Sequence, residues 1–137
     1  MNKHKRNKTN AILSAFYEYT LITFPIGLYV SFEAIHKNSW SYLATSPEWG
    51  IAVIFLIFIS VSKYISAIRK CEKEVNEVSI KVFNLSRLIG IIISVIVSLY
   101  SVLWDNETLV IIRIVLFVIS TTSFLFLFTI SELIKSK

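Results

Sequence analysis

The chain is poor in the residues from which most catalytic sites are built. Its 137 residues include one cysteine, two prolines, three glycines and two histidines, and Asp105 is the only aspartate. The lone Cys71 excludes an intramolecular disulfide and a metal site made of cysteines alone. Three widely separated glycines provide neither a phosphate-binding loop nor a dinucleotide-binding fingerprint. We therefore expect no enzymatic activity, no cofactor and no bound metal.

Charge is also scarce, and this places the chain in a membrane. Charged residues make up 17% of the chain, hydrophobic residues make up 55%, and the mean hydropathy is +0.67. Soluble domains are about one quarter charged, because polar helix faces must cover their core. The net charge of +5 is carried by residues that flank apolar runs. This position favours contact with lipid headgroups over direct binding of nucleic acid.

Four apolar segments are long enough to cross a bilayer as helices. The first cannot be a signal peptide, because its apolar stretch is too long and contains Glu18 and Pro25. The second is expected to begin at Trp49, because Ser46 and Pro47 are typical of a helix start. The turn between the last two segments is short, which makes them antiparallel neighbours. We predict a single all-α transmembrane domain, an antiparallel four-helix bundle with spans at 11–34, 49–68, 85–104 and 108–131.

The distribution of basic residues predicts the orientation. All but two of the 14 Lys and Arg residues fall on one side of the predicted layout, the exceptions being Lys37 and Arg113. By the positive-inside rule, both termini and the charged loop at 69–81 are then cytoplasmic. The three tryptophans all fall at the opposite interface, as an aromatic belt requires. We therefore expect a multi-pass membrane protein with the segment at 33–48 outside. The richness of the chain in Ile, Lys, Ser and Asn suggests an AT-rich bacterial gene, so the expected location is a bacterial inner membrane.

Glu18 and Lys63 are candidates for an intramembrane ion pair. An ionisable group is costly in hydrocarbon and usually faces the bundle interior, a partner or water. At 1.5 Å of rise per residue, both side chains lie about 9 Å from the cytoplasmic edge of the core. The shared depth allows a pair or a proton-sensitive gate. Alternatively, each side chain extends independently to the interface.

Two further features of the spans have a dynamic and a static interpretation. Pro25 and Gly27 lie near the middle of the first span, and a proline there invites a kink. This kink is either a hinge or a fixed feature that neighbouring helices tolerate. The third span carries small residues at helical spacing, and they could line a pore or pack against the fourth span or another copy. They are Gly90, Ser94, Ser98 and Ser101.

Charged residues near the membrane surfaces complete the candidates. Glu33 and His36 lie one turn apart and could respond to external pH or form a solvated pair. Arg113 could pair with Asp105, Glu107 or Glu33, or act as a topological anchor. The cytoplasmic loop could contact lipid or recruit a soluble cytoplasmic protein through its basic residues, Arg69, Lys70, Lys73 and Lys81.

The size and four-span layout resemble the small phage-exclusion membrane proteins of bacteria and some immunity proteins against pore-forming toxins. The resemblance is one of architecture and carries over no site residues. It implies a self-associating membrane component, either an ion-leak pore or a membrane sensor, of a phage-defence or stress system. The alternative is an immunity protein or a membrane anchor for a soluble partner. A small proton-coupled transporter that uses Glu18 is disfavoured, because transporters usually show repeated halves.

Overall fold

The computed structural model describes residues 3–71, 77–104 and 106–135, and this part of the chain is entirely helical or in short turns. Four helices are long and apolar enough to cross a membrane. This confirms the all-α bundle predicted from composition and run length. The protein is thus a polytopic membrane protein with four spans. The helices are α1 (Lys3–His36), the short α2 (Tyr42–Thr45), α3 (Trp49–Cys71), α4 (Glu77–Leu103) and α5 (Glu107–Lys135).

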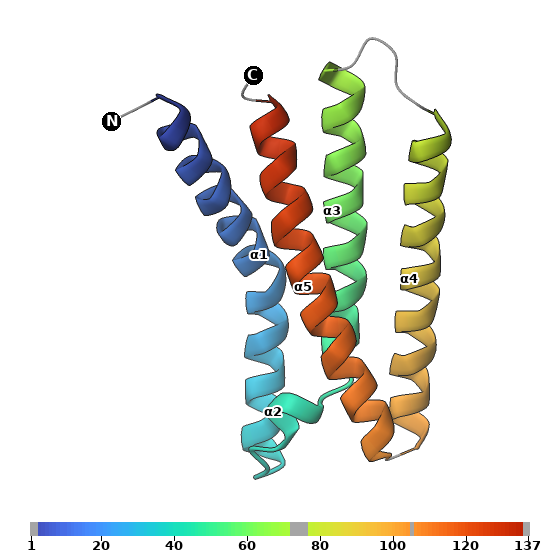
Figure 1. Ribbon diagram of the computed structural model, residues 1–137. Coiled ribbons are helices and arrows are strands. Elements are labelled where there is room, and N and C mark those ends of the chain that lie inside the picture. Colours follow the sequence, from blue (N-terminus) through green and yellow to red (C-terminus); the bar gives the residue numbers. More distant parts are fainter. Residues whose placement is uncertain (1–2, 72–76, 105, 136–137) are drawn as a thin grey trace.

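The long helices run in alternating directions (Figure 1). The start of α1 and the end of α5 lie at one end of the bundle, which we call the termini end. The opposite end, which contains α2, is called the α2 end. All four long helices extend beyond their predicted spans at the termini end, and the extension is longest for α1, which begins at Lys3, and α4, which begins at Glu77. The 34 residues of α1 correspond to about 50 Å of helix, more than the ~30 Å hydrocarbon core, so α1 projects beyond it.

α5 forms the centre of the bundle, where it packs against α3 and α1. Phe124 and Phe128 of α5 are fully buried against Leu56 of α3 and Ala15 of α1. α4 packs mainly on α3, through a second cluster in which Ile80 meets Val61 and Ile65. Large apolar side chains on the outer faces of all four long helices remain exposed. Such faces are typical of helices solvated by lipid.

The segment at 33–48, expected to be an external loop, contains the single-turn helix α2. Trp49 Nε1 donates a hydrogen bond to the carbonyl of Leu43 (2.7 Å), and its ring packs on Phe117 of α5. The Ser46 hydroxyl accepts the backbone N–H of Glu48 (3.3 Å) directly before α3. These contacts fix α2 against the bundle and start α3 at Trp49, the residue predicted from the Ser46 and Pro47 signals.

Candidate functional site

The structure brings Glu18 of α1 and Lys63 of α3 together. Lys63 Nζ lies 3.6 Å from Glu18 Oε1, and the two side chains remain 32% and 37% exposed respectively. Lys63 Nζ also lies 3.8 Å from the centre of the Phe128 ring, a favourable cation–π position. Because roughly two thirds of each side chain is covered by protein, the pair joins the two helices rather than extending freely into the surroundings.

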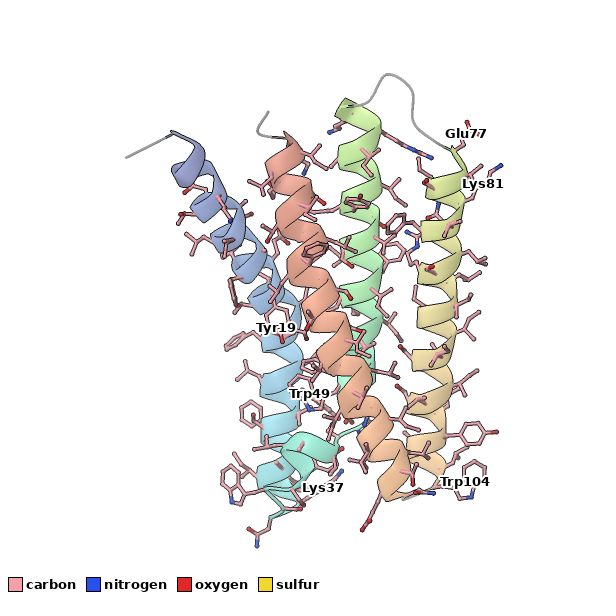
Figure 2. The ribbon with its side chains drawn as sticks, viewed as in Figure 1. Tyr19, Lys37, Trp49, Glu77, Lys81 and Trp104 are labelled. Atoms are coloured by element: carbon pink, nitrogen blue, oxygen red, sulfur yellow. The ribbon has the colours of Figure 1, made fainter. Side chains whose placement is uncertain are left out.

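α1 packs on the bundle around this pair and again toward the α2 end, where Val30 and Ala34 are buried. Ala15 and Tyr19 pack into the cluster of Leu56, Phe124 and Phe128, and the Tyr19 hydroxyl lies 3.5 Å from Thr121 Oγ1 of α5. Figure 2 shows Tyr19 near the middle of α1. Toward the termini end, α1 leans away from α5 (Figure 1). The ion pair therefore lies in the half of α1 that leans away, and Ala11 and Ala15 remain buried beyond it.

Pro25 and Gly27 lie within the unbroken helix α1. Proline lacks the N–H that would bond to the carbonyl four residues earlier, so it locally weakens the helix. α1 and α5 approach each other near their middles and diverge toward both ends, with α2 beside α1 at the α2 end (Figure 1). Gly27 faces α3, because a Cβ built there would lie 3.7 Å from the Trp49 ring, an ordinary contact distance. Whether this region moves as a hinge stays a prediction.

The small residues of α4 face α3. A Cβ built on Gly90 would lie 3.3 Å from Ile57, and one built on Gly50 would lie 1.8 Å from the Ser98 hydroxyl. Ser94 is buried in the same contact and bonds to the carbonyl of Gly90 (2.8 Å). The partner of this stripe is thus α3, whereas the sequence suggested the last helix or another copy. The side chain of Ser101 lies outside the described residues.

The basic residues proposed for lipid or partner contact lie at the termini end. Arg69 and Lys70 are exposed on the last turn of α3, and Lys81 is exposed on the first turns of α4. Figure 2 shows Lys81 near Glu77 at this end. Lys73 lies outside the described residues. The exposed cations are therefore available to anionic lipid headgroups or to an acidic protein surface.

At the α2 end, Glu33 pairs with Lys37 (3.2 Å), which lies one helical turn after it, rather than with His36. Lys37 Nζ also lies 3.8 Å from the centre of the Tyr42 ring, which anchors it on α2. Glu33 is only 30% exposed, but the lysine is 47% exposed. An ion pair this open to solvent contributes little to stability.

Arg113 is the residue whose environment the sequence did not reveal. It lies in α5 yet is only 3% exposed, and its Nη2 donates a hydrogen bond to the carbonyl of Thr45 at the end of α2. No ion pair joins it to Glu107 or Glu33, and Asp105, the other predicted partner, lies outside the described residues. The contact that buries Arg113 comes from α2, a single turn of helix without a recognisable sequence signal.

Comparisons with protein-family models, with curated proteins and with solved structures give no match. The class of the protein therefore rests on its four apolar helices. Within the described residues, no cluster of three or more His, Cys, Asp or Glu side chains could hold a metal ion. Two charged sites within the spans remain as functional candidates, the Glu18–Lys63 pair and Arg113.

Proposed function

We propose that the protein is a non-enzymatic membrane sensor of a bacterial inner membrane, a self-associating component of a stress or phage-defence response. The sensing event is a movement of α1 relative to α3. The observation that carries this proposal is the Glu18–Lys63 ion pair, which joins α3 to the half of α1 that leans away from α5 toward the termini end.

A charged pair in this position is suited to sensing. While the two charges are paired, the pair is electrically neutral, and the transmembrane field exerts little net force on it. Once the pair separates or Glu18 takes up a proton, an isolated charge remains in the span, and moving one charge through the full membrane field is worth about 2.3 kcal/mol per 100 mV. Opening the contact therefore couples the position of α1 to the membrane potential and to proton concentration.

Self-association is supported by the faces that the bundle leaves uncovered. α1 and α4 lie at the edges of the bundle, and each presents a long apolar surface on which large side chains such as Phe32 and Leu99 are exposed. Lipid or a second copy can cover these faces. The ion-leak alternative receives less support, because the small residues of α4 that could line a pore pack against α3. A conduction path would then have to form between copies.

The second candidate, an immunity protein or a membrane anchor for a soluble protein, is supported by the exposed cations at the termini end. Arg69, Lys70 and Lys81 gather there on two helices. The test is whether the wild type retains a component of a purified cytoplasmic fraction. Loss of this component from an Arg69→Gln, Lys70→Gln double variant would favour this function over sensing.

Three variants test the sensor: Glu18→Gln, Lys63→Met and the double variant. Removing one member of a fully buried pair costs about 3 to 5 kcal/mol, and the partial exposure here makes the cost smaller. We expect each single variant to accumulate less in the membrane and the double variant to accumulate normally. Energy transfer between differently labelled copies then measures association before and after an uncoupler dissipates the proton gradient.

The wild type should change its association when the gradient collapses, and the double variant should not respond. The matched control is Glu33→Gln with Lys37→Met, which removes the more exposed pair at the α2 end and should respond like the wild type. An unresponsive wild type, or a double variant that still responds, would refute the proposal. Single variants with normal accumulation and response would show that the pair is dispensable.

A further inference from the structure

A cavity of about 700 Å³ lies at the α2 end, between α2 and the turn that joins α4 to α5. Its walls include Tyr42 and Thr45 of α2, Trp104 and Asn106 from the turn, and Glu107 and Arg113 of α5. Figure 2 shows Trp104 at this end of the bundle. The cavity is independent of the Glu18–Lys63 pair, which joins α1 and α3.

Arg113 supplies the charge of this cavity, and most of its hydrogen-bonding capacity is unused. Its Nη2 bonds to the carbonyl of Thr45, but Nε and Nη1 have no hydrogen-bond partner among the described residues. Together these two nitrogens carry three of the five N–H donors of a guanidinium. A buried N–H donor without a hydrogen-bond partner costs free energy, and the cost is higher when the donor belongs to a charged group. Such a group therefore calls for an explanation.

The Glu48 carboxylate attracts the charge of Arg113, but no neighbouring carboxylate accepts a hydrogen bond from Nε or Nη1 within the described residues. Glu48 is the acidic residue closest along the chain to α2, and its carboxylate accepts hydrogen bonds from the hydroxyls of Tyr42 (3.3 Å) and Ser46. No carboxylate in the described part of the chain forms a salt bridge with Arg113. A buried cation with three free donors that faces a cavity is a site for an oxyanion.

The depth of the site indicates which oxyanion. Arg113 lies six residues into α5, about 9 Å from the start of that helix, so it lies near the boundary between the headgroups and the hydrocarbon core. The abundant oxyanions at this boundary are lipid phosphates, which arginine binds through several N–H donors at once. Glu107, on the wall of the same cavity, can receive a positively charged amine.

We propose that Arg113 binds a phosphate group in this cavity, and that the phosphodiester of an amine-bearing phospholipid headgroup is the ligand. The phosphate accepts hydrogen bonds from free N–H donors of the guanidinium, and the headgroup amine lies toward Glu107. Bound lipid would then hold α2 against α5 through the same guanidinium that bonds to Thr45.

The test uses the full chain, purified in detergent and delipidated. Native mass spectrometry measures the binding of phosphatidylethanolamine, and inorganic phosphate is the second probe. Arg113→Lys keeps the positive charge and one donor for Thr45 but loses the planar set of N–H donors of the guanidinium. Val110→Trp fills the cavity without changing the arginine. We expect both variants to bind lipid about tenfold more weakly, the effect of losing one or two charged hydrogen bonds.

Arg87→Gln is the matched control, because Arg87 is also a partly buried arginine of a span but bonds to Ser62 of α3. This variant should bind lipid like the wild type. If the protein bound inorganic phosphate through Arg113 but did not bind lipid, the phosphate site would be supported and its ligand would be a free ion. Equal lipid binding by the wild type, Arg113→Lys and Val110→Trp would overturn the proposal. The proposal would also be overturned if the wild type bound neither probe but Asp105→Asn bound one. The carboxylate of Asp105 would then be the partner of Arg113.

Discussion

Gly50 of α3 and Ser98 of α4 lie in close contact, and the contact leaves no room for a methyl group. A Cβ at position 50 would lie 1.8 Å from the Ser98 hydroxyl oxygen and 3.0 Å from its Cβ. Rotating the hydroxyl relieves the first contact but not the second. We therefore expect Gly50→Ala to force the two helices apart.

The magnitude follows from two opposing effects. Overpacking a close contact costs about 1 to 3 kcal/mol, whereas replacing glycine by alanine within a helix gains up to about 1 kcal/mol. With an overpacking cost of about 2 kcal/mol and the full gain, Gly50→Ala should lower the free energy of unfolding by about 1 kcal/mol. Gly27→Ala is the matched control, because its Cβ would meet the Trp49 ring at 3.7 Å, a normal distance. That variant should be neutral or slightly stabilised.

A second substitution tests whether the clash itself is the cause. Ser98→Ala removes the hydroxyl oxygen, which is buried and has no hydrogen-bond partner among the described residues. It should therefore restore part of the stability that Gly50→Ala loses. The assay is unfolding in mixed micelles titrated with sodium dodecyl sulfate, followed by tryptophan fluorescence. If Gly50→Ala unfolds at the same detergent fraction as the wild type, the close packing of α3 on α4 does not exist in the membrane.

Two further predictions concern the core and the orientation. Phe124→Ala should lower the free energy of unfolding by about 3 to 5 kcal/mol, the usual cost of emptying a buried aromatic site. Phe126→Ala, on the exposed side of α5, should change it little. Similar losses for the two variants in the same detergent titration would contradict the burial of Phe124. By the positive-inside rule, topology reporters fused after residue 137 and within 69–81 should report a cytoplasmic location, and a reporter within 37–46 an external one. An external location for the reporter after residue 137 would contradict the predicted orientation.

The axial positions of residues could be predicted from the sequence because the rise of a helix is constant. Counting residues placed Glu18 and Lys63 at one depth, and the structure has them 3.6 Å apart. The start of α3 at Trp49 was similarly predictable, because helix starts have local sequence signals. The long apolar runs predicted the four spans for the same reason, since length and hydropathy are properties of each segment alone.

The choice of partner helix could not be predicted in this way. Small residues on α4 indicate that some helix approaches closely, but not which one, and here it is α3 rather than α5. The burial of Arg113 depends on α2, which has only four residues and no periodic pattern. The charge of Arg113 suggested a surface anchor, and only the fold shows that a carbonyl of α2 covers it.

α5 contacts both charged sites, since it carries Arg113 and the Phe128 ring that lies against Lys63. Arg113 lies near one end of α5 beside α2, and Phe128 lies toward the other end beneath Lys63. The intervening helix is about 22 Å long and packs along α3, so it has little freedom to deform. α1 contacts this unit mainly through α5 and only to a smaller extent through α3. The Glu18–Lys63 pair adds a polar contact between α3 and the half of α1 that leans away at the termini end.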